Sequence, residues 1–237
     1  MRGLRLEFEG MVNSSFVVRL FLSIILCRLS LALPNDLKDA DSYAITVPKR
    51  HWSDFSGLAQ FLKQSSASGS GKSELFRARV IYRWVVGHIK YKDLDTDSFP
   101  VRPAWQSPHG SYFNDGLSPQ QTLVRRFTDC EGFALLYEAL SREMGLQVMF
   151  ISGFAGLNGV TGYHAWNAVQ IDGQWEMVDV TWGAHPEQRE RWFLTPKSKF
   201  LTSHVPDKEF LNTDCYSKLR LSPATLGSLK MQLHRQR

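Results

Sequence analysis

Residues 162–182 read GYHAWNAVQIDGQWEMVDVTW, two largely apolar stretches joined by Asp-Gly at 172–173. Asp-Gly between stretches of this kind is among the strongest signals for a hairpin with a two-residue turn. We therefore predict two antiparallel strands, one over residues 164–171 and one over residues 174–182.

The predicted turn determines which side chains lie opposite one another. Counting outward from it, His164 faces Thr181, and two residues closer to the turn Trp166 faces Asp179. His164 and Asp179 then lie on the same face of the sheet, one diagonal step apart, with Cβ atoms about 7 Å apart or a little less. At that separation the carboxylate can hold one imidazole nitrogen. A three-residue turn would place the two side chains on opposite faces.

Upstream, residues 128–140 read TDCEGFALLYEAL and predict a central helix. Thr128 and Glu131 have the spacing of a capping box, and the apolar residues that follow recur at helical spacing as far as the stop signal Gly145. With Thr128 as the N-cap, Cys130 is the second residue of the helix. Unpaired backbone N–H groups and the helix dipole favour an anion there, so this position favours a reactive thiolate.

Each of these residues alone also has an ordinary structural explanation. Asp129 and Glu131 carry negative charge beside the thiol and oppose a thiolate. A single Cys is most often buried and inert, and a surface His or a strand Asp is common. In combination, however, Cys130, His164 and Asp179 supply a nucleophile, a base and an orienting carboxylate. We therefore interpret these three residues as candidate catalytic residues.

The rest of the chain completes an α+β pattern. Apolar residues at helical spacing predict helices over residues 54–64 and 74–90. A segment rich in Asp, Pro, Ser, Asn and Gly predicts a long irregular loop over residues 93–119. Further strands are predicted over residues 146–154 and 192–194. This order is typical of an α+β domain in which the helix carrying the Cys packs on an antiparallel sheet carrying the His and the Asp.

The composition excludes several classes of protein. The 237 residues are 43% hydrophobic and 22% charged, which excludes collagen, a coiled coil and wholesale disorder. Three cysteines cannot form a disulfide-stapled scaffold. The net charge is +5, but residues 215–237 hold five basic and no acidic side chains, so part of this charge lies on a tail. We therefore expect no nucleic-acid partner.

The N-terminal segment has the proportions of a signal peptide. Residues 20–33 read LFLSIILCRLSLAL, an apolar stretch preceded by Arg19 and ending in a small-x-small pattern at residues 30–32. The stretch is shorter than the about 20 residues that a membrane-spanning helix needs, so no stable span is expected. Arg28 inside it argues against a signal peptide, and the alternative is a loosely docked hydrophobic helix or a disordered segment. The protein is secreted if the segment is cleaved near Ala32, and is otherwise cytoplasmic.

Three parts of the chain are predicted: a signal-like or disordered segment over residues 1–40, a folded domain over 41–214 and a basic tail over 215–237. The sequence has no EF-hand, HExxH or CxxC pattern, and its seven histidines lack the spacing of metal ligands. We therefore predict no metal and no other cofactor. The oligomeric state is left open.

The same stretches resemble a known family. Residues 129–140 (DCEGFALLYEAL) and 162–182, in this order, are similar to the Cys and His-Asp blocks of the transglutaminase-like superfamily, which has a papain-like fold. Within this superfamily, these stretches resemble the kyphoscoliosis peptidase group more closely. Residues 77–91 (RARVIYRWVVGHIKY) resemble that group's helix before the active-site loop, and residues 192–207 (WFLTPKSKFLTSHVPD) resemble its segment after it. The resemblance covers roughly residues 45–210.

The resemblance implies a thiol acyl-transfer mechanism. Cys130 corresponds to the nucleophile, His164 to the general base and acid, and Asp179 to the orienting carboxylate. The thiolate would attack an amide of a protein or peptide, either a Gln side chain or a peptide bond, to give a thioester that water hydrolyses or a Lys amine converts into a cross-link. Asp129 departs from the family, which often has a small or apolar residue before the Cys, and its carboxylate would blunt the thiol.

The sequence leaves open which residues bind the oxyanion, which residues line the site, and which of two functions the chain has. The Cys130 N–H and the side chain of Gln121 or Trp105 are candidate oxyanion donors. Trp166 and Trp182 flank the site in the predicted hairpin, where they either line it or serve as core aromatics. The chain is expected to be a cysteine peptidase or amidase. The alternative is a catalytically weak or inactive scaffold that binds protein partners of the cytoskeletal type.

Overall fold

The computed structural model describes residues 36–64, 73–91, 102–103, 117–157, 160–207 and 217–221. A helix over residues 36–44 precedes the helices η1 (Lys49–His51), α2 (Phe55–Gln64), α3 (Glu74–His88), α4 (Pro119–Arg125), α5 (Cys130–Glu143), α6 (Val180–Gly183), η3 (Pro186–Gln188) and α7 (Lys197–Phe200). The strands are β1 (Lys90–Tyr91), β2 (Arg102–Pro103), β3 (Phe127–Thr128), β4 (Val148–Leu157), β5 (Val160–Ile171), β6 (Gln174–Val178), β7 (Phe193–Thr195) and β8 (His204–Pro206).

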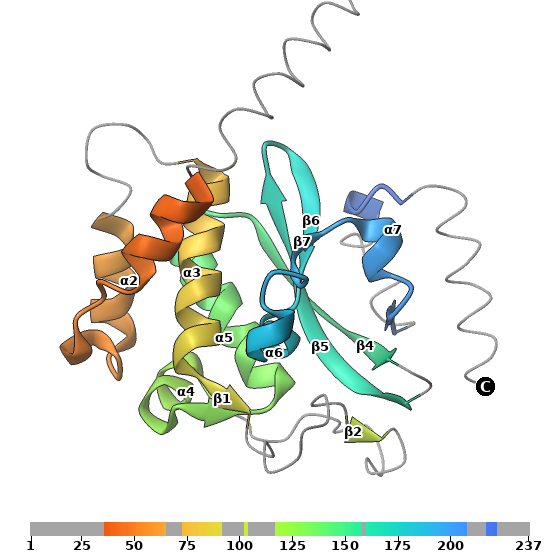
Figure 1. Ribbon diagram of the computed structural model, residues 1–237, viewed down its shortest axis with the longest axis horizontal. Helices are drawn as coiled ribbons and strands as arrows, with labels where there is room; N and C mark the ends of the chain where they lie inside the picture. Colours follow the sequence, from red (N-terminus) through yellow and green to blue (C-terminus); the bar gives the residue numbers. More distant parts are fainter. Residues whose placement is uncertain are drawn as a thin grey trace, which may run out of the picture.

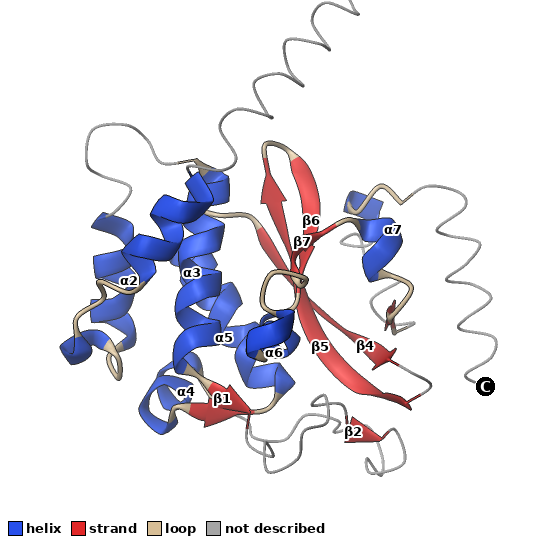
Figure 2. Ribbon diagram, in the orientation of Figure 1, coloured by secondary structure: helices blue, strands red, loops and turns tan. Residues whose placement is uncertain are grey.

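The fold is α+β, with helices gathered on one side of an antiparallel sheet. The main sheet has the strand order β7-β6-β5-β4-β8, and β2 pairs with β5 outside this path. Helices α2, α3, α4 and α5 lie on one side of the sheet and α7 lies on the other (Figure 1). Figure 2 shows how the helices and strands separate into these layers. Strands β1 and β3 form a small parallel pair beside α4.

Each face of the sheet has its own apolar core because alternate residues of β5 point to opposite sides. The first core lies between the sheet and the helices and includes Ala165 and Val169. The second core lies between the sheet and α7 and is rich in aromatic residues. Its largest fully buried side chains are Trp166, Trp182, Trp192 and Phe200.

The predicted hairpin is confirmed close to its turn and is wrong at its far end. Strands β5 and β6 pair from Ile171↔Gln174 to Asn167↔Val178, as the two-residue turn requires. The strand predicted to continue to residue 182 stops at Val178, where helix α6 begins after Asp179. The expected strand pairs beyond this point, those of His164 and Trp166, are therefore not formed with β6.

The other predicted elements correspond closely to observed ones. The helices predicted over 54–64 and 74–90 are α2 and α3, and the strands predicted over 146–154 and 192–194 are β4 and β7. Most of the segment predicted as an irregular loop lies outside the described residues.

The signal-like N-terminal segment also lies outside the described residues as far as residue 35. The helix over residues 36–44 buries Ala40 and Ala44 in the first core. Within the described ranges, no helix combines the length and the apolar character that crossing a membrane requires.

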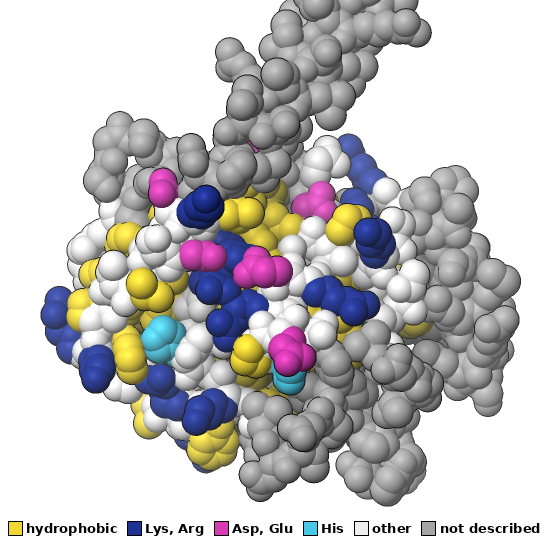
Figure 3. All heavy atoms as spheres, viewed as in Figure 1, with side chains coloured by type: hydrophobic (Ala, Val, Ile, Leu, Met, Phe, Trp, Pro, Cys, Tyr) yellow, Lys and Arg dark blue, Asp and Glu magenta, His cyan; other side chains and the backbone are white. Residues whose placement is uncertain are grey.

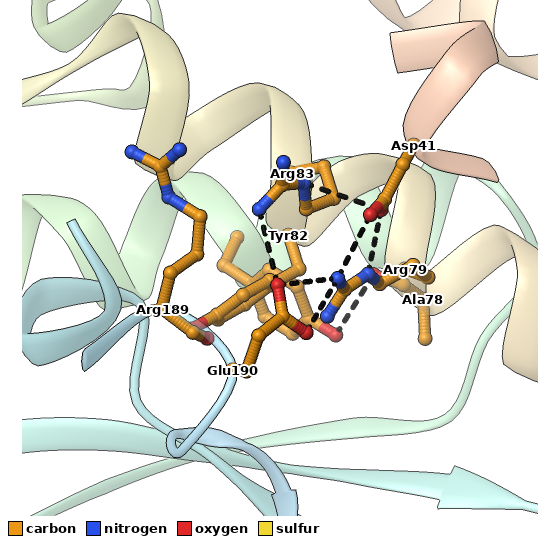
Figure 4. Close-up of polar contacts among 8 residues, drawn as sticks. Asp41, Ala78, Arg79, Tyr82, Arg83, Arg189 and Glu190 are labelled. Atoms are coloured by element: carbon orange, nitrogen blue, oxygen red, sulfur yellow. Dashed lines mark hydrogen bonds and ion pairs between the residues drawn. The ribbon is translucent and has the colours of Figure 1, made fainter. Parts of the chain in front are cut away.

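An ion-pair cluster centred on the buried Arg79 joins α3 to two distant segments (Figure 4). Arg79 is 2% exposed, and its guanidinium donates to Asp41 of the first helix and to Glu190, at 2.7 Å in each case. Arg83 lies beside it and pairs with the same two carboxylates. On the face of the molecule that Figure 3 shows, acidic and basic side chains are interspersed.

Candidate active site

Cys130 is the first residue of helix α5. The N-cap is Asp129, whose Oδ1 accepts a hydrogen bond from the backbone N–H of Gly132 at 3.2 Å. The predicted cap at Thr128 is wrong, because Thr128 ends strand β3 and pairs there with Tyr91 of β1. Thr and Asp are both good N-caps, and the strand pairing leaves this role to Asp129. Cys130 still lies in the first helical turn, where unpaired N–H groups favour an anion.

Asp179 is positioned by a helix start rather than by a strand. It is the N-cap of α6, and its Oδ1 accepts hydrogen bonds from the N–H groups of Thr181 and Trp182, both at 2.9 Å. Its own N–H donates to the carbonyl of Trp192 at 2.9 Å. These contacts leave Oδ2 to face the sheet, where it lies 2.8 Å from Nε2 of His164. The expected contact between His164 and Asp179 is thus present, although the strand pairing that predicted it is not.

His164 and Asp179 form a fully buried pair. Burial alone would lower the pKa of His164, but attraction to Asp179, their hydrogen bond and the nearby Cys130 raise the pKa to about 10. Burial alone would raise the pKa of Asp179, but attraction to His164 and hydrogen bonds from His164 and His204 hold that pKa far below its usual value. The imidazolium form of His164 is therefore strongly favoured next to this carboxylate.

Cys130 lies near His164. The thiol is close enough to contribute to the raised pKa of His164. Nδ1 of His164 is buried and has no hydrogen-bond partner among the described residues, so the sulfur does not meet hydrogen-bond geometry. Cys130 itself is 3% exposed. The site therefore brings together a buried thiol, an imidazole and a carboxylate, and of these only the imidazole and the carboxylate are hydrogen-bonded.

His204 joins the site, although the sequence analysis did not select it. Its Nε2 lies 3.1 Å from Oδ2 of Asp179, the oxygen that His164 also contacts. Burial lowers the pKa of His204 to about 4, against the opposing effect of Asp179, so this imidazole is neutral at pH 7. His204 falls within the stretch 192–207 that carried the family resemblance, but no spacing rule connects it with Asp179.

Asn167 is a second addition to the site. Its Nδ2 donates to the carbonyl of Ala134 in α5 at 3.2 Å and to that of Met149 in β4 at 3.4 Å. The amide therefore ties strand β5, which carries His164, to helix α5, which carries Cys130.

The side chains of His164, Asp179 and His204 could also be considered as metal ligands. Their donor atoms lie within 4.8 Å of one another, and all three residues are buried. Direct hydrogen bonds of 2.8 and 3.1 Å already account for the close approach of both imidazoles to the carboxylate. Among the described residues, this is the group of His, Cys, Asp and Glu side chains whose donor atoms are close enough to hold a metal ion.

Of the four other site residues that the sequence suggested, three lie in described parts of the structure. Trp166 and Trp182 are fully buried in the second core, with ring centroids 6.3 and 5.1 Å from that of His164. Gln121 closes a capping box at the start of α4, where its Oε1 accepts from the N–H of Ser118 at 2.9 Å. Trp105 lies outside the described residues. Roles in lining the site or binding an oxyanion stay predictions for these four side chains.

A comparison with known proteins identifies a family that this sequence matches. The family model described as the Transglutaminase-like superfamily matches residues 62–180. Kyphoscoliosis peptidase of Mus musculus is 29% identical over 201 residues, covering 75% of this chain and 27% of that protein. Kyphoscoliosis peptidase of Homo sapiens is 31% identical over 187 residues, covering 71% of this chain and 25% of that protein.

The chain thus spans about a quarter of the length of these two relatives. Among solved structures, that of a TGase is 20% identical with a TM-score of 0.39, covering 67% of this chain and 37% of that chain.

Proposed function

Because the chain belongs to the transglutaminase-like superfamily, we propose that it is a thiol acyl-transfer enzyme that acts on protein amide bonds. Cys130 is the nucleophile, His164 the general base and acid, and Asp179 the residue that orients His164. A cysteine peptidase or amidase is the form of this activity that we favour.

The hydrogen bond between His164 and Asp179, with Cys130 near the same imidazole, is the observation that carries the proposal. Nε2 of His164 is held by Asp179 at 2.8 Å, and the nearby Cys130 contributes to the raised pKa of His164. An imidazole held in this way can take the thiol proton and keep it as the imidazolium. The start of α5 adds backbone N–H groups near the sulfur, which favour the thiolate.

The reaction proceeds in two halves with His164 moving one proton in each. Sγ of Cys130 attacks the amide carbonyl carbon, forming an S–C bond, and the C–N bond breaks as His164 protonates the departing amine. The resulting thioester is then attacked by water or by a primary amine, whose proton passes to His164. Sγ leaves as thiolate, and the products are a carboxylic acid or a new amide.

A non-enzymatic role in binding protein partners is the second candidate. Two observations favour it: Cys130 is only 3% exposed, and the carboxylate of Asp129 immediately precedes it. Burial would hinder the approach of a substrate carbonyl, and a neighbouring negative charge opposes a thiolate.

Incubation with dimethylcasein and a fluorescent primary amine tests the enzyme directly. Incorporated amine reports transfer and new N-termini report peptide hydrolysis. We expect one of these activities in the wild-type chain and its loss in both Cys130→Ala and His164→Gln. Turnover that survives Cys130→Ala would overturn the proposal. A peptide thioester that leaves no adduct on Cys130 in the intact mass would favour the binding role.

A further inference from the structure

We propose that His204 is a positioning residue, which donates Nε2–H to Oδ2 of Asp179 and thereby holds this carboxylate against His164. The catalytic meaning of this contact rests on the proposed function, whereas the contact itself can be tested without turnover.

The carboxylate of Asp179 is held at both of its oxygens. Oδ1 accepts from the N–H groups of Thr181 and Trp182 at the start of α6. Oδ2 lies 2.8 Å from Nε2 of His164 and 3.1 Å from Nε2 of His204. With His204 removed, only His164 would hold Oδ2, and the carboxylate could turn away from it. The second imidazole therefore restricts the one rotation that would break the contact with His164.

A cage of aromatic rings fixes the position of His204. Its ring centroid lies 3.9 Å from that of Phe200, 4.5 Å from Trp182, 5.0 Å from Trp166 and 5.2 Å from Trp192. The residue is fully buried, so water does not compete for its nitrogens. Hydrogen bonds in such dry surroundings are stronger than in water.

The hydrogen bonds of His204 indicate which nitrogen carries the proton. Oδ2 of Asp179 belongs to a carboxylate and can only accept, so Nε2 of His204 is the donor in their 3.1 Å contact. Oγ of Ser203 lies 2.9 Å from Nδ1 of His204 and 3.1 Å from the carbonyl oxygen of Phe200, and its one hydroxyl proton can go to either acceptor. Nε2 therefore carries the single proton of a neutral imidazole and donates it to Asp179. A neutral donor stabilises the negative charge of Asp179 without competing with the imidazolium of His164.

His204 lies beyond the part of the chain that the family model matches. The family match ends at residue 180, immediately after Asp179. His204 lies 25 residues after Asp179, on strand β8, where it pairs with Ala155 of β4. His204 therefore places part of the site beyond the end of the family match.

Two substitutions separate hydrogen bonding from packing. His204→Phe keeps a ring in the aromatic cage and removes the donor, whereas His204→Gln keeps an N–H donor at the distance of Nε2 from the backbone. In protein with 15N-labelled histidine, the Nε2-bound proton of His164 should give a downfield resonance that exchanges slowly with water. We expect this resonance in the wild type and in His204→Gln, and its loss or rapid exchange in His204→Phe.

A resonance that is unchanged in a folded His204→Phe variant would overturn the proposal. If both variants fail to fold, the wild-type spectrum decides: a proton on Nε2 of His204 supports the proposal, and a proton on Nδ1 alone contradicts it. Neither reading depends on activity. A failure of the acyl-transfer function would leave these resonances in place and would appear only as a Cys130 that forms no thioester.

Discussion

Asp179 caps helix α6 with one carboxylate oxygen and holds His164 with the other, at 2.8 Å. Two backbone N–H groups fix the first oxygen, so the second has a defined direction. The backbone thus anchors one oxygen of this orienting residue, and the imidazole of His204 contacts the other at 3.1 Å. The start of α6 is therefore as much a part of the candidate site as the start of α5.

Substitutions of Asp129 can separate its effect as the N-cap of α5 from the effect of its charge on Cys130. Asp129→Asn should keep the hydrogen bond to Gly132 and most of the stability, because Asn caps helices as well as Asp does. Asp129→Ala should lose about 1 kcal/mol. Both substitutions remove a negative charge beside the thiol, so in both variants the alkylation of Cys130 should set in at a lower pH than in the wild type. Urea unfolding and alkylation rates measure the two effects, and equal stability of both variants would argue against the cap.

Glycine-to-alanine substitutions in two helices should have opposite effects. A Cβ at Gly132 would collide with Oγ1 of Thr128, so Gly132→Ala should lose about 1–3 kcal/mol. Nothing lies within 4 Å of a Cβ at Gly87 in α3, so Gly87→Ala should gain roughly 0.5–1 kcal/mol from helix propensity. Thermal unfolding of both variants checks the pair. A stable Gly132→Ala variant would mean that the first turn of α5 is less tightly packed than described.

The two acidic partners of Arg79 should differ in their contribution to stability. The side chain of Asp41 is 30% exposed and that of Glu190 is 70% exposed. Asp41→Ala should therefore lose about 1–3 kcal/mol, because a buried guanidinium loses its more sheltered partner. Glu190→Ala should lose less than about 1 kcal/mol, because a largely exposed ion pair is screened by water. Chemical denaturation of the two variants tests this order, and the reverse order would contradict it.

His204 should make the protein sensitive to mild acid. Burial lowers its pKa from 6.5 to about 4 in the folded chain. The unfolded chain takes up the proton near pH 6.5 and the folded chain only near pH 4. The stabilising contribution is therefore complete above about pH 6.5 and is lost as the pH falls through this window. The shift corresponds to about 3 kcal/mol.

Urea unfolding at pH 7 and at pH 4.5 measures this loss, with His204→Gln as the matched control. The wild type should lose more stability between the two pH values than the variant does. Equal losses would show that His204 does not remain neutral when buried.

The hairpin was predictable because Asp172 and Gly173 both have positive φ, 49° and 77°, and Asp-Gly is the common pair for such a turn. Its far end was not, because an Asp can continue a strand or cap a helix, and only the packing around α6 selects the second. The cap of α5 was ambiguous for a similar reason, since Thr128 and Asp129 are both cap residues.

His204 could not be found from spacing at all. It reaches Asp179 through the pairing of β8 with β4, a long-range contact that no local pattern encodes. Asn167 was within a quoted motif, but its bond to Ala134 of α5 depends on how the helix packs against the sheet.

The pH dependence of Cys130 alkylation tests the central claim, that His164 and Cys130 act as a pair. Iodoacetamide would be added between pH 4 and pH 9, and modification would be followed on the peptide that contains Cys130, with Cys130→Ala as the reference. Wild-type protein should react at Cys130 well below pH 7, and His164→Gln should react only near pH 8 and above, as an unassisted thiol does. Identical profiles for the wild type and His164→Gln, or a Cys130 that does not react at any of these pH values, would contradict the account.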